Sequence, residues 1–110
     1  MATELVYSSF AADFDMAELI EMFVNELSDR VAVLESACST RRREELRHAA
    51  HQLKGAAGGY GFAEVTSRAA RVEDCIRDGV AEEEICTAVQ ELTSLCRRIR
   101  AGVPEQGRPN

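Results

Sequence analysis

The sequence of 110 residues contains no tryptophan, two prolines and few aromatic side chains, and its formal net charge is −6. A nucleic-acid partner is disfavoured, because phosphate binding needs a basic surface and usually stacking aromatic rings. No apolar run approaches the roughly 20 residues that span a bilayer, and the N-terminus lacks the basic start and apolar stretch of a signal peptide. We therefore expect a cytoplasmic protein with neither nucleic acid nor a membrane among its partners.

Motifs for catalysis or metal binding are also missing. The cysteines at positions 38, 75, 86 and 96 form no CxxC pair and no Cys/His pair at metal-ligand spacing. We expect reduced, buried thiols and no metal site. There is no glycine-rich nucleotide loop, no serine or cysteine paired with a base, and no acidic cluster for Mg²⁺. The chain therefore lacks the means to take phosphate from ATP unaided, and we do not expect an enzyme.

Most of the chain has the periodicity of amphipathic helices. Ala, Glu, Arg and Leu are abundant, and apolar residues recur at i, i+3/i+4 and i+7. We expect helices over residues 16–38, about 40–58, about 62–78 and about 81–100. Their expected inward faces carry Met16, Ile20, Phe23, Leu27, Val31, Leu34 and Cys38; Leu46, Ala50, Leu53 and Ala57; Val65, Ala69, Val72 and Ile76; and Ile85, Ala88, Val89, Leu92, Leu95, Cys96 and Ile99. Short connections favour an all-α fold, an antiparallel up-down four-helix bundle.

Residues with helix-capping character mark the expected boundaries. Asp15 and Glu18 have the spacing of a capping box before the first helix. Ser39 or Thr40 is the expected N-cap of the second helix, and Gly79 should adopt a left-handed conformation after the third.

The chain length fits one domain. We expect the bundle over residues 15–101, preceded over residues 1–14 by a short helix or an extended arm. A disordered tail should follow over residues 102–110.

The stretch HAAHQLKGAAGGYG near the middle of the chain places an unusual set of residues on the second helix. His51 lies about 140° from the start of the apolar stripe and therefore faces solvent. Arg47 and Lys54 flank it at i−4 and i+3, and Gly55 and Gly58 continue the same ridge.

Glycines inside a helix need a reason, because each costs roughly 1 kcal/mol relative to alanine. A helix C-terminus accounts well for Gly58, Gly59 and Gly61. It accounts poorly for Gly55, since the apolar stripe continues past it. A functional reason is access: a glycine one turn from His51 lets another protein bring a bulky reactive centre up to the ring.

The chemistry open to this ridge is nucleophilic. Neutral imidazole is a nucleophile near neutral pH, since its unperturbed pKa is about 6.5. A cation such as Lys54 can neutralise a phosphoryl group on the ring nitrogen. The chain is therefore equipped to carry a phosphoryl group.

These residues resemble the signature of histidine-containing phosphotransfer (HPt) domains, H-x-L-K-G followed by a small, glycine-bearing stretch on a helix of a four-helix bundle. The matching residues are His51, Leu53, Lys54, Gly55, Gly58 and Gly61. The resemblance covers residues 15–100, including the segment RVED on the third helix. Ala56 and Gly59 depart from the hydroxyl and polar residues that members often have, which bears on partner choice.

The resemblance implies a phosphocarrier without kinase activity of its own. His51 would accept a phosphoryl group from a receiver-domain aspartyl phosphate, or from a kinase-linked relay, and pass it to another response-regulator receiver. No cofactor of its own is implied, because Mg²⁺ would belong to the receiver. The expected partners are receiver domains and a hybrid or sensor histidine kinase, and we expect a monomer.

The resemblance also implies roles for the surrounding residues. Lys54 would contact the phosphoryl oxygens, and Gly55 and Gly58 would leave room for docking. Glu73 would hydrogen-bond the second ring nitrogen of His51 and leave Nε2 as the nucleophile. The alternative for Glu73 is a solvated ion pair with Arg77 at i+4. Additional positive charge at the site would come from Arg77 and Arg47.

Several alternatives remain open. His48 is a second exposed histidine, without lysine at i+3 or glycine at i+4. The run Arg41 to Arg43 is either a solvated turn balanced by glutamates or a steering patch for an acidic receiver. Leu19, Met22 and Val33 either pack against the N-terminal segment or form a docking patch; the docking candidates are Phe10, Phe14, Leu19, Met22 and Gln52.

Two classes of function fit this sequence. The first is a phosphorelay carrier. The second is an HPt-like bundle that binds a receiver domain without being phosphorylated, in which His51 would be replaceable. Acid-labile phosphorylation at His51 separates the two.

Overall fold

The computed structural model describes residues 4–104, which contain four helices and two short strands. The helices are α1 (Ala17–Ser39), α2 (Arg43–Gly59), α3 (Ala63–Arg77) and α4 (Glu82–Cys96), and the strands are β1 (Val6–Tyr7) and β2 (Ile99–Arg100). The predicted all-α class with four helices is confirmed. Residues 105–110 of the predicted tail and residues 1–3 lie outside the described part of the chain.

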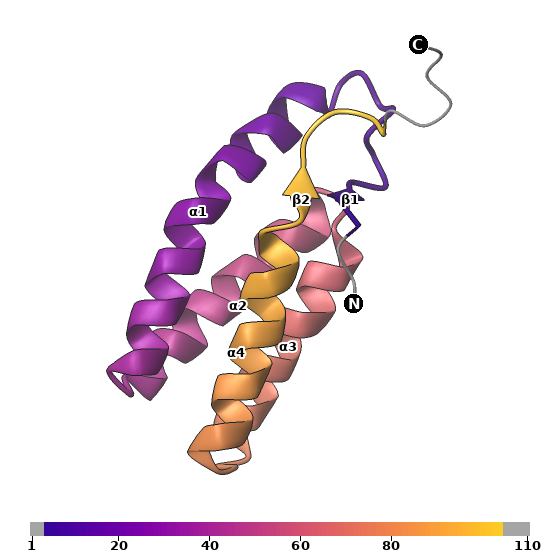
Figure 1. Cartoon of the computed structure of the whole chain (residues 1–110). Helices are drawn as coiled ribbons and strands as arrows, with labels where there is room; N and C mark the ends of the chain where they lie inside the picture. Colours follow the sequence, from indigo (N-terminus) through magenta and orange to yellow (C-terminus); the bar gives the residue numbers. More distant parts are fainter. Residues whose placement is uncertain (1–3, 105–110) are drawn as a thin grey trace.

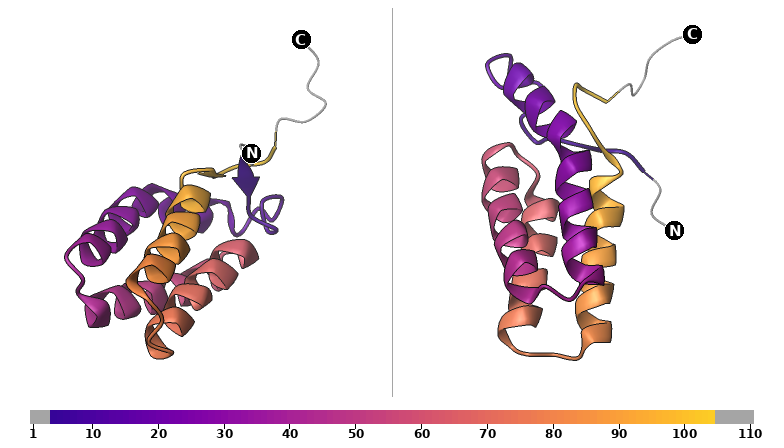
Figure 2. Two further views of the ribbon diagram at one scale, coloured as in Figure 1. Left: turned by 60° about the horizontal axis from the view of Figure 1, so that its bottom comes forward. Right: turned by 90° about the vertical axis from the view of Figure 1, so that its left-hand side faces the viewer.

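The helices surround one common core. α1 packs against α2 and α4, and α3 packs against the same two helices, so each helix has two neighbours (Figures 1 and 2). Almost all of the predicted inward-facing residues are buried, and the second-helix stripe is buried completely. Three predicted positions at helix ends are only half-buried, namely Met16, Cys38 and Ile76, and Ala37 is buried in place of Cys38.

The starts of α1 and α2 differ from the predicted ones. The N-cap of α1 is Met16, and no side chain caps it, so the predicted capping box of Asp15 and Glu18 is wrong. The Asp13 carboxylate instead accepts a hydrogen bond from the backbone N–H of Asp15, which turns the chain just before the helix. This side-chain turn at Asp13 takes the place of the predicted cap at Asp15.

The connection between α1 and α2 also lies further along the chain than predicted. Ser39 is the last residue of α1 and Thr40 is its C-cap, so neither caps α2. Both hydroxyls bond back to the carbonyl of Ser36, which satisfies an acceptor at the end of α1. The turn is then made by Arg41, whose φ is +55°.

The third and fourth helices end differently. Gly79 follows α3 with φ +66°, as predicted for a left-handed cap. α4 stops at Cys96, earlier than predicted, and Ile99 is buried from a short strand instead of a helix. β2 pairs in parallel with β1, with Val6 opposite Ile99 and Tyr7 opposite Arg100. This pairing places residues 6–7 beside residues 99–100, which follow α4 (Figure 1).

The turn after α2 seats the N-terminal segment. Gly61 has φ +84°, and a Cβ atom at this position would meet the side chains of Ser8, Ser9 and Phe10. The Ser8 hydroxyl donates a hydrogen bond to the carbonyl of Tyr60 at 2.6 Å, and the N–H of Ser9 donates to the carbonyl of Gly61 at 2.9 Å. Gly61 is therefore required by the packing of residues 8–10 against this turn, as well as by the helix terminus.

Candidate functional site

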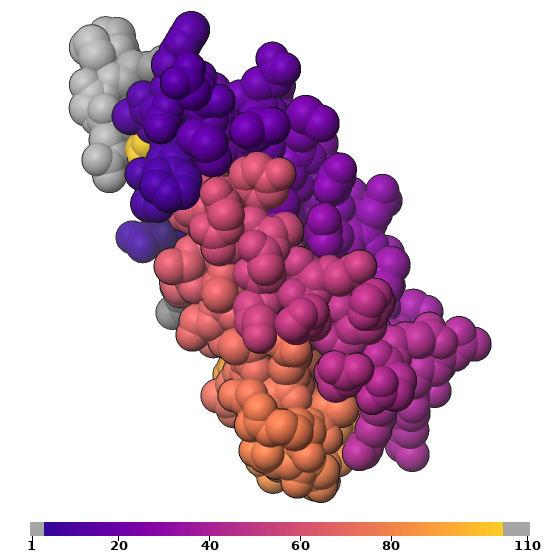
Figure 3. Space-filling view, turned by 180° about the vertical axis from the view of Figure 1, so that it is seen from behind, coloured from indigo at the N-terminus to yellow at the C-terminus, as the bar shows by residue number. Residues whose placement is uncertain are grey.

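His51 lies on the outer face of α2. The buried stripe of this helix, Leu46, Ala50, Leu53 and Ala57, points to the opposite side. The His51 side chain is 61% exposed, and the outer surface of α2 is open to solvent (Figure 3). A partner molecule can therefore reach the ring without any rearrangement of the bundle.

Glu73 comes to this histidine from α3. It follows the fully buried Val72, and only 14% of its side chain is exposed. Its Oε2 lies 2.9 Å from Nδ1 of His51, and its Oε1 lies 2.7 Å from Nζ of Lys54. One half-buried carboxylate on α3 thus contacts both His51 and Lys54 of α2. The predicted alternative, a solvated pair of Glu73 with Arg77, is wrong.

The contact between His51 and Glu73 determines the tautomer of the ring. A carboxylate only accepts hydrogen bonds, so Nδ1 of His51 carries a proton and its N–H donates a hydrogen bond to Glu73. In the neutral ring, Nε2 then holds a lone pair. The arrangement orients the imidazole and presents an unprotonated nitrogen to solvent.

Three contributions determine the charge state of Glu73. Burial by itself would raise the pKa of this carboxyl, but its contacts with Lys54 and His51 outweigh burial and hold the pKa below the usual value. Glu73 is therefore a carboxylate at neutral pH. It is balanced by the Lys54 ammonium and is able to stabilise positive charge that develops on the ring.

Lys54 is within reach of both the carboxylate and the space beside His51. It lies one turn further along α2, and 34% of its side chain is exposed. The ion pair between Lys54 and Glu73 was not predicted, because spacing within α2 carries no information on what α3 places opposite. The hydroxyl of Thr66 on α3 donates to the Lys54 carbonyl at 3.1 Å, which further ties the two helices together at this level.

Arg77 is not part of this cluster. It pairs at 3.0 Å with Asp74 and at 3.3 Å with Asp78, and these contacts raise the pKa of Arg77, with the Asp78 hydrogen bond making the largest contribution. Asp74 and Asp78 stand three residues before and one residue after Arg77, so the sequence alone could have predicted this pairing.

Arg47 is engaged on its own helix. It contacts Glu44 at 3.0 and 3.2 Å, and the hydrogen bond with that carboxylate raises the pKa of Arg47. The charge of Arg47 is therefore directed first at Glu44. Its place one turn before His51 keeps it on the same side of α2.

The glycines on this ridge leave the surface next to His51 low. A Cβ atom at Gly55 would have no neighbour within 4 Å, whereas a Cβ atom at Gly58 would lie 3.4 Å from the Thr66 hydroxyl. The bundle therefore does not need glycine at position 55 for its own packing. Gly55 lowers the stability of the helix relative to alanine, and no packing contact in the bundle explains its presence. A docking surface that needs close approach of a partner would explain it.

The apolar docking candidates remain exposed. Phe14 is 93% exposed and Met22 is 56% exposed, and Phe10, Leu19 and Val33 are also exposed. The interpretation that Leu19, Met22 and Val33 pack against the N-terminal segment is therefore wrong. Gln52 is exposed and lines a shallow hollow of about 150 Å³ between α1 and α2.

His48 differs from His51 in its surroundings. Its side chain is exposed, and within residues 4–104 no hydrogen bond or ion pair orients its ring. Of the two histidines on α2, His51 alone has a carboxylate across the helix interface.

Comparison with known proteins agrees with this geometry. A family model of the Hpt domain matches residues 18–102. Searches of curated proteins and of solved structures found no significant match. None of the helices within residues 4–104 combines the length and apolar character that a membrane crossing needs. Because the family model covers well over half of the sequence, the chain belongs to the Hpt domain family, whose members transfer phosphoryl groups through a histidine in two-component phosphorelays.

Proposed function

We propose that the protein is a phosphorelay carrier in which His51 accepts a phosphoryl group from the aspartyl phosphate of one receiver domain and delivers it to the aspartate of another. The observation that carries this proposal is the hydrogen bond from Nδ1 of His51 to the Glu73 carboxylate on an otherwise exposed ring. It leaves Nε2 free to react in the direction of a docked partner.

In the transfer step, the Nε2 lone pair attacks phosphorus and the P–O bond to the receiver aspartate breaks. The aspartate leaves as a carboxylate, so no proton has to be removed from His51. The phosphorylated ring keeps its proton on Nδ1 and becomes cationic. Glu73 stabilises this cation, and return of the phosphoryl group to a second aspartate restores the neutral imidazole.

Lys54 provides the compensating charge on the phosphoryl side. The transferred group brings negative oxygens to the same ring that the Glu73 carboxylate contacts, and the ammonium of Lys54 already lies 2.7 Å from that carboxylate. A modest rotation of the lysine chain lets it bridge Glu73 and a phosphoryl oxygen. Arg47 and Arg77 would act only through longer-range attraction, because nearby acids hold both.

The partners would provide the rest of the chemistry. Mg²⁺ and the acidic pocket belong to the receiver domain, and a hybrid or sensor histidine kinase would supply the phosphate. Docking would use the exposed residues next to the ridge, namely Phe14, Leu19, Met22 and Gln52, with Gly55 and Gly58 allowing close approach. We place this carrier in the cytoplasm as a monomer, built as an antiparallel up-down bundle over residues 15–101.

The test is phosphotransfer from radiolabelled receiver domains of the same organism in the presence of Mg²⁺. Wild type and His48→Gln should acquire acid-labile label, and His51→Gln should acquire none. If all three proteins bind a receiver domain and none is labelled, the chain is an interaction module and the carrier proposal is wrong. Labelling that disappears in His48→Gln and persists in His51→Gln would move the acceptor to His48.

A further inference from the structure

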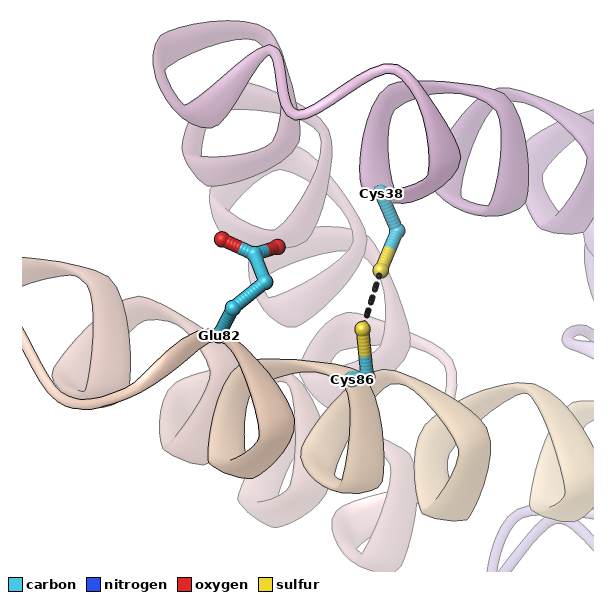
Figure 4. A group of neighbouring side chains, drawn as sticks. All are labelled: Cys38, Glu82 and Cys86. Atoms are coloured by element: carbon cyan, nitrogen blue, oxygen red, sulfur yellow. Dashed lines mark hydrogen bonds between the residues drawn. The ribbon is translucent and has the colours of Figure 1, made fainter.

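A cluster outside the His51 site joins the end of α1 to the start of α4. Cys38 lies in the last turn of α1, and Glu82 and Cys86 occupy adjacent turns of α4. The three side chains converge in the space between the two helices, as Figure 4 shows. Their potential ligand atoms all lie within 4.8 Å of one another.

The separation of the two sulfur atoms fits a shared tetrahedral ion. The Sγ atoms of Cys38 and Cys86 are 3.5 Å apart. Two thiolates at the usual Zn–S distance of about 2.3 Å in a tetrahedral site stand about 3.8 Å apart. The observed separation therefore needs only a small adjustment. A Glu carboxylate as third ligand leaves the fourth position for water.

Neighbouring residues orient the Glu82 carboxylate, and a surface hollow gives access to the cysteines. Arg43 at the start of α2 lies 2.7 Å from Oε1 of Glu82, which orients the carboxylate and leaves its Oε2 available. All three ligand residues are half-buried. Both cysteines, together with Ser39 and Gln90, line a surface hollow of about 290 Å³, through which solvent can approach them.

The chemistry of the three side chains suits a thiophilic cation. A divalent cation attracts the Glu82 carboxylate and binds each cysteine as a thiolate, whose proton it displaces.

We propose that Cys38, Cys86 and Glu82 bind a thiophilic divalent cation of the Zn²⁺ class, which fastens the end of α1 to the first turns of α4. Binding replaces the two thiol protons by two metal–sulfur bonds and releases both protons to solvent, with no change of oxidation state. The site is independent of phosphotransfer at His51. It departs from the sequence expectation of no metal, because ligand spacing along one chain segment cannot reveal residues that meet across helices.

The proposal is tested with reduced protein titrated with Co²⁺ and then Zn²⁺. Wild type should develop sulfur-to-cobalt charge-transfer absorption at one equivalent with the release of about two protons, and Zn²⁺ should abolish the absorption without further proton release. Cys38→Ser and Cys86→Ser should each lose the absorption, and Glu82→Gln should weaken binding, because a neutral amide replaces the anionic ligand. Cys75→Ser removes a half-buried thiol from α3 and should leave the titration unchanged.

A thermal measurement provides a second readout. Free Zn²⁺ at about 100 times its Kd should raise the folding equilibrium constant of wild type about 100-fold and leave that of Cys38→Ser unchanged. If reduced wild type gives no cobalt absorption, or if Cys38→Ser and Cys86→Ser bind as wild type does, the proposal is overturned. Failure of reduced wild type to bind, together with a Cys38–Cys86 cross-link formed by peroxide, would identify a redox pair in place of a metal site.

Discussion

His51 and Glu73 meet at 2.9 Å across the interface of α2 and α3, although they are 22 positions apart in the sequence. The exposed ring is thus oriented by a carboxylate whose own position is fixed by the buried stripe of α3. The helix α3, and not a loop, positions Glu73 beside His51. Substitutions that alter the packing between α2 and α3 should therefore change the reactivity of His51.

Removal of the Glu73 carboxylate should slow phosphotransfer to His51. We expect Glu73→Ala to lower the rate of labelling about 10- to 100-fold, because the ring loses its fixed tautomer and the stabilisation of its cationic product. The measurement is single-turnover transfer from a labelled receiver domain. Nitrogen NMR of the ring should show a rise in the Nε2–H tautomer.

Asp74→Ala is the matched control for this prediction. It removes the neighbouring carboxylate of α3, which is 55% exposed and pairs with Arg77. Transfer and ring tautomer should both stay as in wild type. If Glu73→Ala slows transfer without changing the tautomer, orientation of the ring is not the reason for the effect.

Substitutions of Gly55 should have different effects on the stability of the protein and on the docking of a receiver domain. A Cβ atom there has open space around it, so Gly55→Ala should stabilise the protein by about 0.5–1 kcal/mol through helix propensity. Gly55→Gln should fold as well as wild type but slow transfer from a receiver domain at least 10-fold, because the longer side chain stands where the partner approaches.

The control for position 55 is Ser94→Gln, which places the same side chain on an exposed position of α4. The measurements are chemical denaturation and the concentration dependence of transfer. Equal transfer by Gly55→Gln and Ser94→Gln would remove the access argument for this glycine.

Periodicity was sufficient to predict the four helices and nearly all of the core, because burial repeats along each helix. It was also sufficient to place His51 on the outer face of α2. The ends were less predictable: α4 stops at Cys96, where pairing of β2 with β1 offers an alternative to further helix. That competition depends on a contact between residues 6–7 and 99–100, which are far apart in the sequence, so local propensity does not contain it.

The candidate site shows the same division. Glu73 was assigned to His51 through the family resemblance, whereas the ion pair between Lys54 and Glu73 was not predicted. Such contacts depend on the rotation of α2 relative to α3, and a shift of one residue in either helix would remove them. The meeting of Cys38 and Cys86 across α1 and α4 was missed for the same reason.

Two glycines with positive φ should respond differently to alanine. Gly79→Ala at φ +66° meets only backbone strain and should cost about 1 kcal/mol. Gly61→Ala at φ +84° should cost more, about 2–3 kcal/mol, because the new Cβ atom also displaces Ser8, Ser9 and Phe10. Denaturant unfolding of the two variants measures the difference. An equal loss of stability in Gly61→Ala and Gly79→Ala would mean that the N-terminal segment moves away from the new Cβ atom without a measurable free-energy cost.

The pH dependence of stability should report the lowered pKa of Glu73. A carboxyl group whose pKa is lower in the folded state stabilises the fold above its unfolded pKa of about 4.3, and this stabilisation disappears as the pH falls through the folded value. At neutral pH, Glu73→Gln should therefore be less stable than wild type by about 1 kcal/mol, a value reduced by the exposure of Lys54 and His51. Below the folded pKa the two proteins should converge. Denaturation from pH 7 to pH 3 checks this, with Asp74→Asn as the exposed control. A constant difference across that range would show that Glu73 contributes through packing and not through its charge.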